Sequence, residues 1–406
     1  MAALESIMES SLAFATQAVH AGERAPKPDF TPVNTPIYQS ASFVYDTLET
    51  MDAIFGGERS GYVYTRYGNP TVAALERAVA TLEGGETAVA YASGMAAIHA
   101  TLLALEVVSG VAVVAAQDLY GATSTLLTTI FARQGVNVRL VDMTDLDQVE
   151  SIMRDLRPKV VLAEMISNPL LKVVDLAQVA MLAHAHGATL VVDSTFTSPY
   201  LLQPLCYGAD FVIHSTTKSL GGHGDVTGGI VVAPAAHRPQ LELVARLVGG
   251  VLSPHEAYLT LRGLKTLPLR VRQQCQNAMA MAEWLADHPH IRTVYYPGLE
   301  QHPGHHIARR VLRQGCFGSV LSFELVDGDR ERVFAFLNGL RLCLPATTLG
   351  DIYTELLYPT MSSHRILTPE QRSAIGISDA LIRLSAGIED AGDLIADLDQ
   401  ALRKVS

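Results

Sequence analysis

The stretch FVIHSTTKSLGGHGDVTGG, from Phe211 to Gly229, places one of the chain's six lysines directly after a strand-like run. Hydroxyl residues lie just before Lys218, among them Ser215 and Thr217, and a turn rich in glycine follows it. A lysine amine can bond covalently to a carbonyl compound, and it can carry a proton when its surroundings lower its pKa. The stretch therefore predicts a site for covalent or acid–base chemistry.

Other binding groups follow predicted strands at the points where those strands end. Ligands of α/β proteins gather at the carboxyl ends of the strands, so we expect these groups to share one site. The groups are Gly94 and Met95 at the start of a helix, Tyr120, Asn168, Asp193, Ser215, Thr217 and Lys218. Together they provide a helix N-terminus, an aromatic ring, an amide, a carboxylate, two hydroxyls and an amine.

This set of groups suits pyridoxal 5'-phosphate (PLP). The cofactor needs an amine for its Schiff base, an acid beside its pyridine nitrogen and donors for its phosphate. Gly94 lets the backbone approach the phosphate closely, and the helix dipole favours the anion. Asp193 is placed to keep the ring nitrogen protonated, which makes the ring an electron sink. Each residue alone has an ordinary role as a cap, a turn or a surface charge, but their occurrence at successive strand ends favours the cofactor.

Short apolar strands alternate with helical segments from about residue 70, and this alternation must position the site. PTVAALERAVATLEG has apolar residues at helical spacing and ends at Gly84 and Gly85, a typical helix stop. The strand-like runs TAVAYAS, VAVVAA, VNVRLVD, VVLAEMIS, TLVVDS and DFVIHS are short and mostly apolar. The pattern predicts an α/β fold with a mostly parallel sheet that is covered on both faces.

Three regions are predicted along the chain. Residues 1–65 are rich in proline and turn formers, which indicates an extended N-terminal arm that crosses to a neighbouring subunit. Residues 66–264 hold the alternating strands and helices and form a large domain. After about residue 255 the pattern changes to a helix interrupted near Pro268, followed by strands and helices, so residues 265–406 predict a smaller α+β domain.

Composition excludes several classes of function. The net charge of -11 argues against a nucleic acid or an anionic membrane surface as partner. No apolar stretch is long enough to span a membrane, and the N-terminus lacks the basic start of a signal peptide. The four scattered cysteines favour reduced thiols in a cytoplasmic protein. The histidines of HAHG and QHPGHH do not predict a metal site.

Seven motifs, in order along the chain, resemble the signatures of the Cys/Met-metabolism PLP-dependent enzymes. They are YVYTRYGNPT, AVAYASGMAAIHA, DLYGAT, SNPLL, VVDSTFTSPY, HSTTKSLGGHGDVTGG and LIRLSAGIED. That family includes cystathionine γ-synthase, cystathionine γ-lyase, methionine γ-lyase and the O-acylhomoserine sulfhydrylases. The resemblance implies the PLP-dependent transferase fold type I with a seven-stranded-type sheet. It also implies a homo-oligomer, a tetramer built from two active dimers.

The resemblance assigns a role to each cofactor-binding residue. Lys218 is the Schiff-base lysine, Tyr120 stacks on the ring, Asp193 pairs with the pyridine nitrogen and Asn168 reaches the side of the ring hydroxyl. The phosphate is expected to bind the hydroxyls and backbone N–H groups of Ser215, Thr217, Gly94 and Met95, with Tyr64 and Arg66 supplied by a neighbouring subunit.

The substrate side shows departures from the family pattern. Arg383 matches the arginine that binds the α-carboxylate of the substrate, and a planar guanidinium suits that role. Thr348 stands where most members have serine, and Tyr353 stands where cystathionine enzymes have glutamate and sulfhydrylases have a basic residue. Ala122 replaces the cysteine usual in methionine γ-lyases, and Ser194 replaces a usual asparagine.

The sequence thus predicts γ-elimination or γ-replacement on a homoserine-type or sulfur amino acid. Lys218 would remove the α-proton, and Tyr120 would protonate the leaving group. The alternatives are a β-lyase acting on cystathionine or cysteine, and a γ-lyase for an unusual γ-substituted amino acid such as canavanine. An aminotransferase or a descendant without catalytic activity is a further reading, but the presence of Lys218, Asp193 and Arg383 argues against loss of activity.

Overall fold

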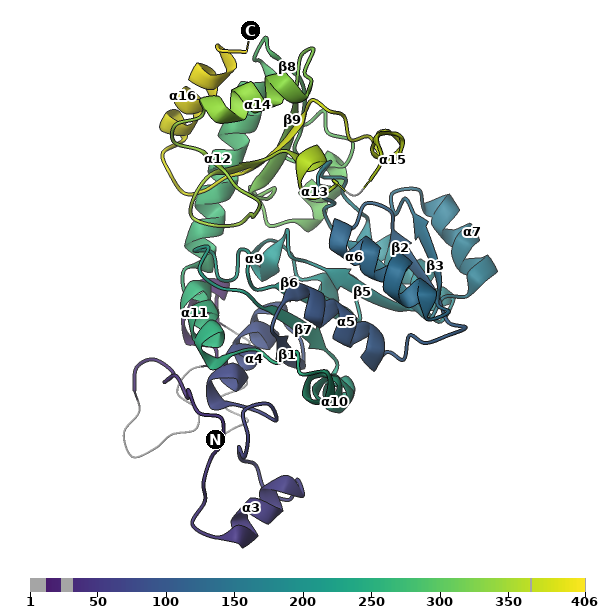
Figure 1. Ribbon diagram of the computed structural model, residues 1–406, viewed down its shortest axis with the longest axis vertical. Helices are drawn as coiled ribbons and strands as arrows, with labels where there is room; N and C mark the ends of the chain where they lie inside the picture. The colour runs from purple at the N-terminus through teal and green to yellow at the C-terminus, as the bar shows by residue number, and fades with distance from the viewer. Residues whose placement is uncertain (1–11, 23–31, 366, 406) are drawn as a thin grey trace.

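Two β-sheets with their packed helices form most of the computed structural model (Figure 1). The structure describes residues 12–22, 32–365 and 367–405. The first sheet has seven strands in the order β1-β7-β6-β5-β4-β2-β3. These strands are β1 (Thr87–Tyr91), β2 (Ala112–Ala116), β3 (Asn137–Val141), β4 (Val160–Glu164), β5 (Thr189–Asp193), β6 (Phe211–Ser215) and β7 (Gly229–Ala233).

Parallel pairing runs through most of the first sheet. Strands β2 to β6 pair in parallel, and β7 is antiparallel to both β6 and β1. Strands β4 and β7 are buried at every position, as expected where both faces are covered. The predicted mostly parallel sheet is confirmed. Strand β7 is not among the predicted strands, because its GIVVA run follows the glycine-rich turn with no helix to mark a new unit.

Helices pack against this sheet, with α5 on β6 and β7 and α4 on β1. The Asn69 side chain caps α4 by accepting a hydrogen bond from the backbone N–H of Thr71 at 2.9 Å, and Gly84 ends the helix at φ 70°, a conformation that favours glycine. The helices of this part are α4 (Pro70–Glu83), α5 (Gly94–Ala104), α6 (Gly121–Thr125) continuing as η1 (Leu126–Phe131), α7 (Leu146–Leu156), α8 (Leu176–Ala185), α9 (Ser198–Leu201), η2 (Pro204–Tyr207), η3 (Ala235–His237), α10 (Arg238–Val248) and α11 (Pro254–Leu264).

The second sheet belongs to the C-terminal part of the chain and has the order β10-β11-β12-β9-β8. Its elements are α12 (Leu267–Ala286), β8 (Ile291–Tyr295), α13 (His305–Val311), β9 (Val320–Leu325), α14 (Arg330–Gly339), β10 (Leu344–Pro345), β11 (Glu355–Leu357), η4 (Pro359–Met361), α15 (Pro369–Ala374), β12 (Leu381–Ser385) and α16 (Ala391–Leu402). The predicted interruption near Pro268 is confirmed, since α11 ends at Leu264 and α12 begins at Leu267.

The two faces of the second sheet differ in polarity. Leu356 and Leu384 point to the buried core face, whereas Arg383 and Ser385 alternate to the opposite face. In Figure 1 the second sheet lies above the first, and the Ser322 hydroxyl of β9 donates a hydrogen bond to the carbonyl of Pro169, just beyond β4, at 2.7 Å. The polar face of the second sheet therefore meets the carboxyl ends of strands of the first.

Parts of the predicted N-terminal arm, residues 1–11 and 23–31, lie outside the described residues. The described parts contain two short helices, α2 (Phe14–His20) and α3 (Leu48–Phe55). Helix α2 packs against α4 and α12, while α3 lies at the far end of the molecule from the second sheet (Figure 1). The boundaries of the three predicted regions stay a prediction. No helix in the described ranges has the length and apolar character needed to cross a membrane.

Candidate active site

Four predicted site residues from different parts of the chain meet at one place. The Lys218 amine, which follows β6, donates a hydrogen bond to the Thr348 hydroxyl at 2.9 Å. Arg383 of β12 donates to the backbone carbonyl of Thr348 at 2.8 Å and to the amide oxygen of Asn168 at 3.1 Å. Both sheets thus contribute to the site.

The surroundings of Lys218 favour its neutral amine. Burial, and then the positive charge of Arg383, lower the pKa of Lys218, while the carboxyl groups of Asp351 and Glu355 oppose this effect. Burial also lowers the pKa of Arg383 to about 10, so the guanidinium still carries its charge at neutral pH. The site therefore holds a lysine suited to proton transfer next to a fixed cation suited to a carboxylate.

Two carboxyl groups lie side by side at the ends of β4 and β5, where Glu164 pairs in register with Asp193. Glu164 accepts a hydrogen bond from the backbone N–H of Tyr120 at 2.6 Å, and Asp193 accepts one from the N–H of Thr195 at 3.0 Å. Burial raises the pKa of both carboxyl groups, and that of Glu164 is raised further by the charge of Asp193. A nearby cation, such as a protonated ring nitrogen, would stabilise the ionised form of Asp193.

The start of α5 forms a cradle against the end of β6. Ser93 caps the helix by accepting a hydrogen bond from the N–H of Ala96 at 3.0 Å. A Cβ atom on Gly94 would lie only 3.0 Å from the Cβ of Ser215, so the glycine permits this close approach. The first backbone N–H groups of the helix and the Ser215 hydroxyl are donors of the kind that bind an anion, and Thr217 lies nearby on the turn that returns to Gly228.

Not every predicted site residue joins this group. Arg66 donates a hydrogen bond to the carbonyl of Arg246 on α10 at 2.7 Å, and its guanidinium lies 5.6 Å from the ring centre of Tyr64. Within one chain the structure therefore gathers Tyr64 and Arg66 beside α10. The Tyr353 side chain, 50 % exposed, lies in the loop before β11.

Sequence reasoning missed three acidic residues close to the site: Glu164, Asp351 and Glu355. Glu164 ends β4, but it lies inside the predicted run VVLAEMIS, where one acidic residue among apolar ones was the available signal. Asp351 accepts a hydrogen bond from the N–H of Gly224 in the glycine-rich turn at 3.0 Å. An acidic residue in a short strand such as β11 carries no comparable signal in the sequence.

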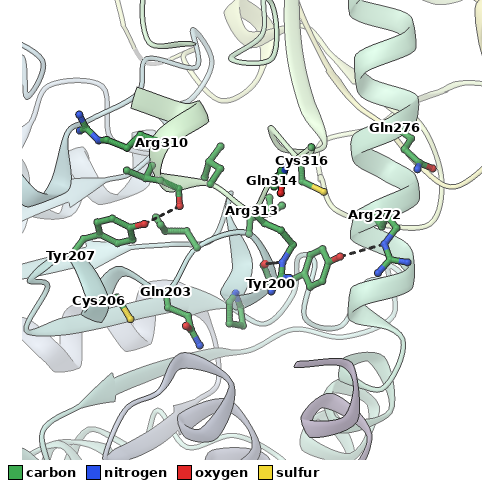
Figure 2. Close-up of a pocket in the computed structure, with 16 residues that line it drawn as sticks. Tyr200, Gln203, Cys206, Tyr207, Arg272, Gln276, Arg310, Arg313, Gln314 and Cys316 are labelled. Carbon is green, nitrogen blue, oxygen red and sulfur yellow. Dashed lines mark hydrogen bonds between the residues drawn. The ribbon is translucent and has the colours of Figure 1, made fainter. Parts of the chain in front are cut away.

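A separate cavity of about 810 Å³ lies between α9, α12 and the segment after α13 (Figure 2). Its lining includes Tyr200, Arg272, Arg313 and Cys316, and none of the predicted site residues. Figure 2 shows Tyr200 between the two arginines, joined to Arg272 through its hydroxyl and to Arg313 through its backbone carbonyl. This cavity is therefore distinct from the site around Lys218.

Comparison with known proteins decides the family. The model of the Cys/Met metabolism PLP-dependent enzymes matches residues 15–403. The chain belongs to this family. It is 44% identical to an L-methionine gamma-lyase of Fusobacterium nucleatum subsp. polymorphum over 96% of the chain and 98% of that protein. It is 42% identical to a cystathionine gamma-lyase of Bacillus subtilis over 92% of the chain and 95% of that protein.

Solved structures give the same result for the fold. The family member described here superposes on a cystathionine gamma synthase of Xanthomonas oryzae pv. oryzae, in complex with aminoacrylate and cysteine, with a TM-score of 0.90. The two are 41% identical, and the match covers 97% of this chain and 98% of the other. The predicted family, α/β fold, PLP cofactor and enzyme class are confirmed.

Proposed function

We propose that this PLP-dependent enzyme catalyses γ-elimination on an L-amino acid of the methionine or homoserine type. The observation that carries the proposal is the set of hydrogen bonds that joins Lys218, Thr348, Arg383 and Asn168. In this set an amine of lowered pKa and a guanidinium that could bind a carboxylate both contact Thr348, which supports the proposal. The methionine and cystathionine gamma-lyases among the relatives support elimination over replacement.

PLP, when bound, supplies an aldehyde that joins amines and a ring that accepts negative charge. The residues present fit it. The phosphate would bind in the α5 cradle, to Gly94, Met95, Ser215 and Thr217. Gly94 leaves the space that an anion needs, whereas a side chain at this position would close it. Asp193 would hold the ring nitrogen, Tyr120 the ring face, and Asn168 the side of the ring hydroxyl.

The remaining residues act on the substrate. Arg383 would bind the α-carboxylate in a bidentate manner, which orients the Cα–H bond towards Lys218. The neutral amine of Lys218 would take the proton from Cα, and the Thr348 hydroxyl 2.9 Å away would fix the direction of its lone pair. The Tyr120 hydroxyl would protonate the leaving group on Cγ.

The proposal extends to assembly and location. In a homo-oligomer, a tetramer of two active dimers, Tyr64 and Arg66 would reach the phosphate of a neighbouring subunit. Their position beside α10 of their own chain supports this, because that position leaves them apart from Lys218. Free cysteines, three of them buried, support a cytoplasmic location.

The test is a substrate panel without added thiol. Methionine, O-acetylhomoserine, cystathionine and canavanine are incubated with the purified enzyme, and 2-oxobutyrate is measured. We expect the 2-oxo acid and ammonia in equal amounts, with one water consumed for each turnover. Lys218→Ala should lower the rate by at least about 1,000-fold, because the proton carrier is lost. A product that forms only with sulfide or cysteine present would identify a synthase instead.

A further inference from the structure

A buried glutamate lies near the proposed carboxylate-binding arginine, and one of its carboxyl oxygens has no hydrogen-bond partner among the described residues. Glu355 of β11 is 6 % exposed, and its Oε2 atom is closed off from solvent with no hydrogen-bond donor among the described residues. Burial of an unpaired carboxyl group destabilises a fold, so such a group calls for a functional explanation.

Strand pairing places Glu355 on the same face of the second sheet as Arg383. Glu355 lies opposite Ser385, and Leu357 lies opposite Arg383, so alternation brings all four side chains to one face. Diagonal neighbours on one face of a sheet lie about 7–8 Å apart. Because this face carries the bonds from Arg383 to Asn168, Glu355 is directed towards the active site.

Four charged groups act electrostatically on Glu355. They come from the loop before β11 (Asp351), the turn after β6 (Lys218), β12 (Arg383) and the loop after β12 (Glu389). Burial, and then the charge of Asp351, raise the pKa of Glu355 to about 7, against the opposing effect of the two cations. Both cations, Lys218 and Arg383, already donate hydrogen bonds to Thr348. An ionised Glu355 therefore adds negative charge to this side of the site.

A substrate bound to Arg383 by its α-carboxylate extends its side chain over a distance similar to the about 7–8 Å that separates diagonal neighbours such as Arg383 and Glu355. The heteroatom on Cγ is four bonds of about 1.5 Å each from the carboxylate carbon, and the rest of the γ-substituent reaches further. We propose that Glu355 recognises the end of the γ-substituent, so that the site selects substituents ending in N–H donors or a positive charge and rejects those ending in a carboxylate. This inference rests on the proposed function, since it names the substrate class of the same site.

The first test compares three probes with wild type and Glu355→Gln. The γ-substituent ends in a guanidine in L-canavanine, is neutral in O-acetyl-L-homoserine, and ends in a carboxylate in O-succinyl-L-homoserine. We expect the ratio of kcat/KM for canavanine to that for O-succinylhomoserine to fall by about 10- to 100-fold in Glu355→Gln, because the variant loses the charge and keeps the shape. Glu331→Gln, on the exposed start of α14, is the matched control and should keep the wild-type ratio.

The second test uses pH and needs no variant. Neither acyl homoserine changes the charge of its γ-substituent between pH 6 and pH 8, whereas Glu355 loses its proton in this range. The wild-type ratio of kcat/KM for O-succinylhomoserine to that for O-acetylhomoserine should therefore fall as the pH rises through about 7. In Glu355→Gln the same ratio should stay flat. A flat wild-type ratio would overturn the inference even if the variant does not fold.

A binding measurement separates this inference from the proposed function. Calorimetry with Lys218→Ala, alone and combined with Glu355→Gln, reports the affinities for canavanine and O-succinylhomoserine without turnover. If no probe is turned over but their relative affinity shifts with Glu355→Gln, γ-elimination fails and the role of Glu355 stands. If turnover occurs but the ratio changes less than about threefold, or changes equally in Glu331→Gln, the role of Glu355 fails alone.

Discussion

At the scale of single residues, Glu164 gives a clear test of the site's electrostatics. Burial and the charge of Asp193 raise its pKa above the unfolded value of about 4.3, so the folded protein holds the proton of Glu164 to a higher pH than the unfolded chain does. Folding thus binds a proton, and the wild type should lose stability relative to Glu164→Gln as the pH rises from about 5 to 8. Urea unfolding of both proteins across this range measures the difference.

The companion variant, Glu164→Ala, removes the hydrogen-bond acceptor and not only the titrating proton. Glu164→Ala leaves the Tyr120 N–H without its acceptor, and we expect a loss of about 1–3 kcal/mol in the free energy of unfolding. If Glu164→Gln instead lost stability against the wild type at high pH, Glu164 would be ionised in the folded protein.

Residue types at strand ends predicted much of the site. Motifs predicted Lys218, Asn168 and Arg383, and the structure joins Lys218 to Arg383 through Thr348 and Asn168 to Arg383 directly. The sequence could not reveal Glu355, because the charged groups that act on it, apart from the nearby Asp351, come from the turn after β6, from β12 and from the loop after β12. Long-range electrostatics of this kind depend on the tertiary structure and not on local spacing.

At the scale of elements, the meeting of α5 and β6 should control cofactor affinity. In Gly94→Ala the new methyl group would lie 3.0 Å from the Cβ of Ser215 and would narrow the space for an anion. We expect PLP to bind the apoenzyme at least about tenfold more weakly, as measured by fluorescence titration. Gly339→Ala in α14, whose nearest neighbouring atom would lie at 3.5 Å, is the control. Equal PLP affinity in both variants would show that the phosphate does not bind at α5.

Elements with strong local signals were predicted well. Helix α4 has a capping asparagine, a proline in its first turn and a glycine stop, so its limits follow from the sequence. The short strands β10 and β11, of two and three residues, have too few positions for alternation to be recognised. They form because β11 pairs with β12 and β10 pairs with β11, which completes the second sheet and is a tertiary effect.

At the scale of the whole molecule, the position of Tyr64 and Arg66 predicts that each active site needs two chains. If Arg66 acts in the neighbouring subunit, Arg66→Ala and Lys218→Ala should each be nearly inactive alone. In a mixed dimer, however, one site combines an intact Lys218 with an intact Arg66 from the partner chain. Co-expression of the two variants should then restore about a quarter of the wild-type activity, because about half of the dimers are mixed and each has one working site. Activity no higher than that of the separate variants would place Arg66 outside the partner's site.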